Sequence, residues 1–62
     1  MILSKIKINY ILAAMLGSKT LASKWWDSPN RAFDMHTPRE MYDNGYQEMV
    51  SDYVVSFYDK VS

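Results

Sequence analysis

The N-terminal segment carries an ambiguous pattern of apolar and polar residues. Ile6, Ile8 and Tyr10 alternate with polar residues, which is typical of a β-strand. Helical spacing is seen over the same stretch and beyond it in Ile8, Ile11, Leu12 and Met15. Because this longer pattern continues into a pair of alanines, we predict a helix from about residue 8, with Ser4 as its earliest start.

A tight helix-to-helix turn is predicted at Gly17 and Ser18. Glycine readily adopts the left-handed conformation that closes a helix, and a serine hydroxyl accepts hydrogen bonds from the free N–H groups that open the next one. We expect the second helix to run from Ser18 through Trp26. Pro29 and Asn30 follow its end, because proline cannot donate a hydrogen bond and biases the preceding residue away from helical geometry.

The clearest helix start in the chain follows a short connection. Residues 31–36 leave room for no more than one helical turn. Thr37 then fits an N-cap, Pro38 fits the first helical position, and Glu40 completes the pattern of a capping box. We expect a short helix from there to the turn dipeptide Asn44-Gly45.

The C-terminal segment has the pattern of a long amphipathic helix. Its apolar face carries Tyr46, Met49, Val50, Tyr53, Val54, Phe57 and Val61. Its polar face carries Gln47, Glu48, Ser51, Asp52, Ser56 and Asp59. Taken together, the segments predict an all-α fold: a single domain over residues 1–62, built as a compact bundle of about four short helices of which the last is long.

Length and composition limit what such a domain can do. The chain has 62 residues, of which 48% are hydrophobic and none is cysteine, so neither disulfides nor thiolate metal sites stabilise it. The unbroken apolar run Tyr10–Leu16 is seven residues long, whereas a membrane span needs roughly 18 or more. We therefore expect a cytoplasmic protein that does not enter a membrane.

The charges cancel overall but are unevenly distributed. Residues 1–31 carry five basic residues and one acidic residue, whereas residues 32–62 carry two basic and six acidic residues. A chain with zero net charge lacks the uniform positive field that attracts nucleic acid, so nucleic acid is disfavoured as a partner. The two halves can instead attract each other, within one chain or between chains.

The sequence has no pattern typical of a catalytic or metal site. His36 is the only histidine, and zinc rarely accepts carboxylates alone, so we interpret His36 as a polar residue beside the Thr37 cap. With Gly17 and Gly45 as its only glycines, the chain has no loop that could cradle phosphate, and no serine stands in a nucleophile elbow. We expect neither enzyme activity nor a cofactor.

The adjacent tryptophans supply a candidate partner contact. Neighbouring residues on a helix point about 100° apart, so the two rings cannot share one face. We expect one ring in the core and the other, Trp26, at a binding surface, where tryptophan is a frequent hot spot. The candidate partner-binding residues are Trp26, Arg31, Tyr53, Phe57 and Tyr58.

Motifs along most of the chain resemble a known family. The resemblance is carried by Leu16-Gly-Ser18, Ala22, Lys24-Trp-Trp26, Pro29-Asn30, Phe33, Thr37-Pro38, Met41, Gly45, Val50 and Val54. Over about residues 8–58 this order and spacing is similar to the toxin-binding domain shared by the Xre, MbcA and ParS antitoxins. The resemblance implies a small helical domain that binds a RES-type toxin, an enzyme that destroys NAD, and holds it inactive. It also implies a shared turn formed by Trp25, Pro29, Asn30 and Phe33.

The sequence departs from that family at several positions. The leucine usual after the first tryptophan is Trp26 here, and the glycine often found before Thr-Pro is replaced by Asp34-Met35-His36. The glycine expected near the end of the family's domain is absent. Only 16 residues precede Gly17, so the resemblance does not extend to a helix-turn-helix half, and operator binding is not implied.

Three functions are compatible with these observations. The first is a stand-alone module that binds and neutralises a RES-type toxin. The second is an inhibitor or adaptor, borne by a phage or another mobile element, that uses the same fold to bind a different host protein. The third, disfavoured by the charge, is a nucleic-acid binder that uses Lys19, Lys24 and Arg31. We also expect a homodimer or a larger assembly, because a core this small gains from burying the apolar face of the last helix.

Overall fold

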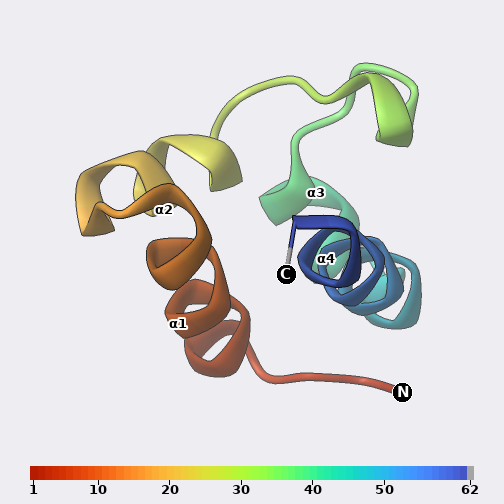
Figure 1. Cartoon of the computed structure of the whole chain (residues 1–62). Coiled ribbons are helices and arrows are strands. Elements are labelled where there is room, and N and C mark those ends of the chain that lie inside the picture. The colour runs from red at the N-terminus through yellow and green to blue at the C-terminus, as the bar shows by residue number, and fades with distance from the viewer. Residues whose placement is uncertain (62) are drawn as a thin grey trace.

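The computed structural model describes residues 1–61 and contains helices alone (Figure 1). Ser62 and the side chain of Val61 lie outside the described residues. The elements are α1 (Lys5–Leu16), α2 (Lys19–Trp26), the short 3₁₀ turn η1 (Arg31–Phe33), α3 (Pro38–Asp43) and α4 (Gln47–Val61). The predicted all-α bundle of four helices, with a long last helix, is confirmed for this part of the chain.

Capping groups explain where the first two helices begin and end. The Ser4 hydroxyl accepts a hydrogen bond from the Lys7 N–H at 3.1 Å, so α1 starts at the earliest predicted position and the alternating residues near it form no strand. Gly17 closes α1 with a φ of 73° and donates its N–H to the Ala13 carbonyl. The Ser18 hydroxyl opens α2 by accepting from the Leu21 N–H. The predicted turn at Gly17 and Ser18 is confirmed.

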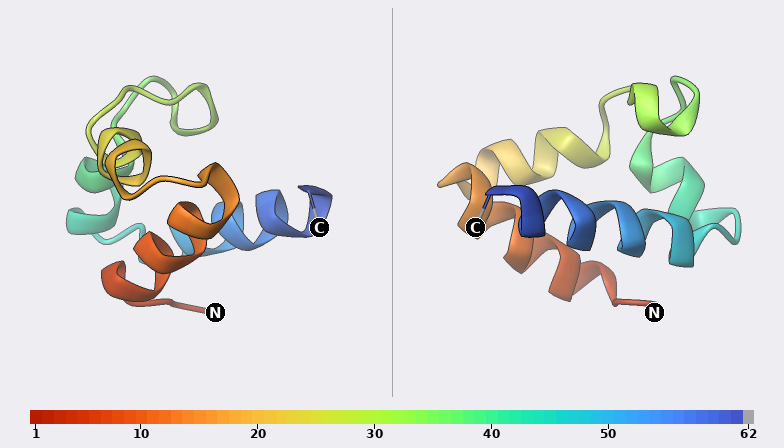
Figure 2. Two further views of the ribbon diagram at one scale, coloured as in Figure 1. Left: turned by 60° about the vertical axis from the view of Figure 1, so that its left-hand side comes forward. Right: turned by 45° about the vertical axis from the view of Figure 1, so that its right-hand side comes forward.

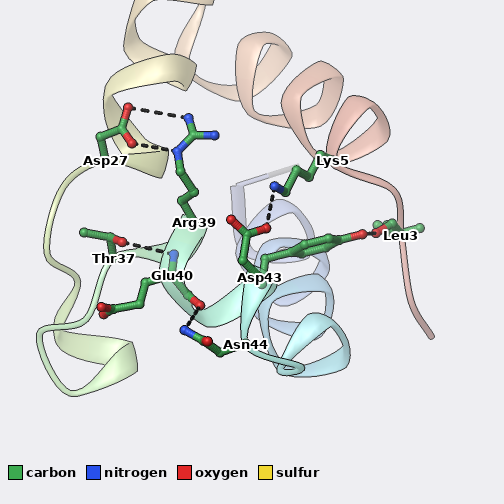
Figure 3. Close-up of polar contacts among 9 residues, drawn as sticks. Leu3, Lys5, Asp27, Thr37, Arg39, Glu40, Asp43 and Asn44 are labelled. Atoms are coloured by element: carbon green, nitrogen blue, oxygen red, sulfur yellow. Dashed lines mark hydrogen bonds and ion pairs between the residues drawn. The ribbon is translucent and has the colours of Figure 1, made fainter.

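The capping box predicted for α3 forms only in part. The Thr37 hydroxyl accepts from the Glu40 N–H at 3.1 Å (Figure 3). Pro38 occupies the first turn of the helix. The Glu40 carboxylate does not complete the box, because it pairs with His36 Nδ1 at 2.7 Å. After α3, Gly45 adopts a φ of 98°, which confirms the turn predicted there.

The helices pack as two pairs around one core. In Figure 1, α1 and α2 lie on one side and α3 and α4 on the other, while α1 also contacts α4 and α2 contacts α3. Figure 2 shows α1 running alongside α4 in both further views. The core consists of Ile8, Leu12, Ala22, Trp26, Phe33, Val50 and Val54.

The polar face predicted for the last helix is wrong at one position. Ser51 is fully buried, because its side of α4 faces the extended N-terminal segment. Its hydroxyl accepts a hydrogen bond from the Leu3 N–H at 2.9 Å and donates to the Gln47 carbonyl at 2.7 Å. Nearby, the Tyr42 hydroxyl donates to the Leu3 carbonyl at 2.7 Å. These bonds attach the segment before α1 to α3 and α4.

Candidate partner-binding groove

A groove runs between η1 and the exposed side of α4, on apolar side chains from both. It consists of two adjoining hollows that share Ala32, Phe33 and Met49. The first hollow has a volume of about 680 Å³ and extends along α4 past Asp52, Tyr53, Ser56, Phe57 and Lys60. The second has a volume of about 540 Å³ and extends toward α3 past Asp34, His36, Glu40, Met41, Asn44 and Tyr46. We call these two hollows together the groove.

Aromatic side chains make the bottom of the groove rigid. Phe33 is buried, and its ring centroid lies 5.2 Å from that of Tyr53. The ring centroid of Tyr53 lies 6.2 Å from that of Phe57. The Tyr53 ring also stacks on Trp25, with 6.3 Å between the centroids and 17° between the ring planes. Edge-to-face and offset-stacked pairs of this kind stabilise a cluster beyond the area they bury. The groove is therefore held by side chains that also belong to the core.

The wall of the groove opposite α4 is the loop of residues 31–36, which is held together by hydrogen bonds to Asn30. The Asn30 side chain accepts from the Ala32 N–H at 2.9 Å, and its carbonyl accepts from the N–H groups of Phe33 and Met35. Its own N–H donates to the His36 carbonyl at 3.1 Å. This confirms the single helical turn predicted between residues 31 and 36 and gives Asn30 a structural role.

Two consecutive residues of this loop adopt left-handed conformations. Asp34 has a φ of 56° and Met35 a φ of 68°, in a region that side chains other than glycine occupy at a cost. The loop therefore combines a backbone conformation that glycine adopts readily with exposed side chains, among them Met35.

The rim of the groove carries more negative than positive charge. Asp52 and Lys60 line the first hollow, whereas Asp34 and Glu40 line the second, where His36 pairs with Glu40. An apolar surface with carboxylates around it matches a partner segment whose apolar side chains are flanked by basic ones.

The predicted partner-binding residues are only partly brought together. Tyr53 and Phe57 line the groove, and the exposed Arg31 stands at the start of η1 beside it. Tyr58 is 45% exposed but lies about 100° further around α4, outside the groove lining. The structure therefore brings Tyr53 and Phe57 together in the groove lining and leaves Arg31 and Tyr58 outside that lining.

The prediction that Trp26 is exposed is wrong. Trp26 is 4% exposed, and its Nε1–H donates to Asn9 Oδ1 at 2.9 Å across α1 and α2. The guanidinium of Arg39 lies over the indole, 6.0 Å from the ring centroid. The half-buried tryptophan is Trp25, since the α1 side of α2 faces the core and takes Trp26 inward.

An ion pair holds the Arg39 side chain above Trp26. Arg39 Nε donates to Asp27 Oδ1 at 2.7 Å, which joins α3 to the end of α2 (Figure 3). This hydrogen bond and the positive charge of Arg39 lower the pKa of the Asp27 carboxyl, and the same pairing raises the pKa of Arg39. Lys5 and Asp43 form a second ion pair, from α1 to α3.

Sequence reasoning missed Met49 and Lys60 as groove residues. Met49 is 48% exposed although it stands on the predicted apolar face of the last helix. The width of that apolar face could have indicated that part of it stays exposed, because the face is broader than the stripe that a single neighbouring helix covers. Phe33 was expected only as an apolar position of the family motif and as part of the turn with Trp25, Pro29 and Asn30, yet it is one of the three residues that both hollows share.

Two kinds of site are not formed by the described residues. Within residues 1–61, no three His, Asp or Glu side chains gather in a way that could hold a metal ion. None of the helices in the same range has the length and apolar character needed to cross a membrane. The groove, with hollows of about 680 and 540 Å³, is the candidate binding site of the described surface.

Comparisons with known proteins identified no relative of the chain. Neither a scan against protein-family models nor searches of curated proteins and of solved structures find a match to the chain.

Proposed function

We propose that the chain is a non-catalytic module that binds another protein through the groove. The observation that carries this proposal is the adjoining pair of hollows, about 680 and 540 Å³, over partly exposed Met49, Tyr53 and Phe57. Such a concave apolar surface with a charged rim is typical of a site that receives an amphipathic helix or an extended segment. Met49 and Phe57 are the side chains that a partner would cover.

The proposed partner is a RES-type toxin in the cytoplasm. Support comes from the resemblance of residues 8–58 to the toxin-binding domain of the Xre, MbcA and ParS antitoxins. The turn residues of that motif are structurally used in this chain: Gly17 closes α1, Asn30 organises the loop, and Thr37 caps α3. In this function the module covers the toxin's NAD pocket and stops NAD destruction.

A different host protein is the second candidate partner. The observation that favours it is the loop tip at Asp34 and Met35, where the chain departs from the family and exposes an apolar side chain beside the groove. A partner contact on Met35 would give a phage-borne inhibitor or adaptor a specificity that the family lacks.

Binding is tested with two variants on α4 that carry the same new charge. Met49 and Tyr58 are 48% and 45% exposed, but only Met49 lines the groove. Met49→Asp is expected to abolish binding because it places a charge on the apolar surface, whereas Tyr58→Asp is expected to bind like the unmodified chain. Circular dichroism first confirms that both variants are folded. Loss of binding in Tyr58→Asp together with normal binding in Met49→Asp would refute the groove as the binding site.

The identity of the partner is tested by NAD consumption. A purified RES-type toxin is mixed with the chain in molar excess, and NAD is followed over time. We expect the toxin to consume NAD more slowly in the presence of the unmodified chain or of Tyr58→Asp, and at its full rate in the presence of Met49→Asp. If the toxin proceeds at full rate in the presence of excess chain, the toxin is not the partner. Affinity purification with the same two variants then identifies any host protein that needs Met49.

A further inference from the structure

The outer side of α1 carries an apolar stripe that the bundle leaves uncovered. We define the α1 stripe as the exposed Ile6, Tyr10, Ala14 and Gly17 together with Ala13, which is half-buried at the edge where the stripe meets the core; these residues follow one another at helical spacing. Ile6 is 84% exposed and Tyr10 is 76% exposed. The core residues of the same helix, Ile8 and Leu12, point to the opposite side. A helix that is apolar on both sides is typically buried on both.

We propose that the α1 stripe packs against the α1 stripe of a second copy, with the two helices antiparallel. The stripe is large in its first half, at Ile6 and Tyr10, and small in its second half, at Ala13 and Gly17. An antiparallel two-fold arrangement places each large half against the small half of the other copy, so the surface is complementary to itself, as a two-fold interface requires. A parallel arrangement would oppose large to large and small to small.

Charge at the helix ends favours the same arrangement. The last turn of α1 has no basic residue to compensate its free carbonyl groups. When Ile6 of one copy lies opposite Gly17 of the other, Lys7 lies opposite Leu16 and its ammonium reaches that helix end. Lys7 is exposed on the flank of the stripe, in the same row along the helix as Ala14. Each copy therefore supplies the cation that the other copy's α1 lacks.

The available area predicts a weak dimer. Ile6 and Tyr10 of two copies together expose on the order of 600–700 Å², and the small residues and the Lys7 stems raise the total contact to about 1,000 Å². That value is at the lower limit of specific interfaces, so we expect dissociation in the micromolar range.

This dimer is independent of the proposed function. The α1 stripe shares no residue with the groove, which lies on η1, α3 and α4. The earlier expectation placed self-association on the apolar face of the last helix. The structure uses the centre of that face, Val50 and Val54, in the core, and its remaining exposed part forms the groove. A dimer through α1 leaves both grooves open.

Sedimentation tests the proposal with matched exposed positions. The unmodified chain is measured across the micromolar range, with Ile6→Ser and Tyr10→Ser as test variants and Met35→Ser, an exposed apolar position on the loop, as control. We expect a dimer that is lost in both α1 variants and persists in the control. A chain that stays monomeric, or a dimer that survives both α1 variants, overturns the proposal.

A cysteine cross-link reports the geometry directly, because the chain has no cysteine of its own. Ala13→Cys lies close to the proposed two-fold axis and is expected to form a covalent dimer under mild oxidation, whereas Ser56→Cys on α4 is expected to remain a monomer. Equal cross-linking at both positions contradicts the proposal. Vesicles containing phosphatidylserine distinguish another occupant: a monomeric chain that sediments with them through Ile6 and Tyr10 assigns the stripe to a lipid surface and overturns the dimer.

Discussion

The buried hydroxyl of Ser51 leads to the sharpest stability prediction. Its oxygen accepts the Leu3 N–H and its hydrogen is donated to the Gln47 carbonyl, at 2.9 and 2.7 Å. Ser51→Ala removes both bonds. The Gln47 carbonyl lies within α4 and keeps its helical partner, but the Leu3 N–H is left in a half-buried position without an acceptor.

The cost follows from these two bonds. A buried donor left without a partner costs about 1–3 kcal/mol, and the lower part of that range applies because Leu3 is only half-buried. Replacing serine by alanine also favours the helix by about 0.5 kcal/mol, whatever the surroundings. Ser56→Ala is the matched control, since Ser56 is exposed on the same helix and gains the same propensity. The difference between the two variants is therefore about 1–2 kcal/mol.

Thermal unfolding followed by circular dichroism measures this difference. For a domain of this size, 1–2 kcal/mol corresponds to a Tm of Ser51→Ala about 4–16 °C below that of Ser56→Ala. Hydrogen exchange at the Leu3 amide is expected to accelerate in Ser51→Ala alone, because the N-terminal segment loses its attachment to α4. Equal Tm values and equal exchange in the two variants would refute the reasoning that Ser51 holds that segment.

Three further predictions concern the turn, the core and the ion pair. Gly17→Ala is expected to lower stability by about 1 kcal/mol in urea denaturation through backbone strain alone, since a Cβ there meets nothing within 4 Å at a φ of 73°; an unchanged midpoint would contradict this. Trp26→Phe is expected to lower stability by about 2 kcal/mol, because it removes the hydrogen bond to Asn9 and leaves a gap in the core; a variant as stable as the parent would place Trp26 outside the core. The lowered pKa of Asp27 means that its pairing with Arg39 stabilises the fold above the ordinary carboxyl pKa of 3.8 and that this contribution is lost as the pH falls through the lower value in the folded state. Denaturation across acidic pH should therefore show a smaller loss of stability in Asp27→Asn than in the parent, and identical profiles would contradict the pairing.

The local turns were predictable because their chemistry is local. Gly17, Ser18 and Thr37 act on backbone groups within three or four residues of themselves, so the pattern of residue types contains most of the information that places them. The capping box shows the limit of such reasoning. The Glu40 carboxylate had a second local partner in His36, and a sequence pattern does not decide between two partners that are equally close.

The wrong predictions concern residues whose surroundings are set by a segment that is distant in the sequence. Ser51 was predicted on the exposed polar face because no residue near it in the sequence indicates that its hydroxyl accepts a hydrogen bond from the Leu3 N–H, 48 residues away. Trp25 and Trp26 are equally apolar, and only the positions of α1 and Tyr53 determine which ring turns inward. The groove is of the same kind, since it exists only once residues 31–36 are folded beside α4.

The bonds around Asn30 bear on how fast and at what entropic cost a partner can bind. The side chain, carbonyl and N–H of this one residue all hold the loop from Ala32 to His36, so the wall of the groove already has a defined shape in the free chain. In the proposed function, a partner that meets such a wall loses little affinity to loop ordering, and association is expected to proceed as a rigid-body encounter. Asn30→Ala is then a change that slows association and raises its entropic cost without touching a single contact residue.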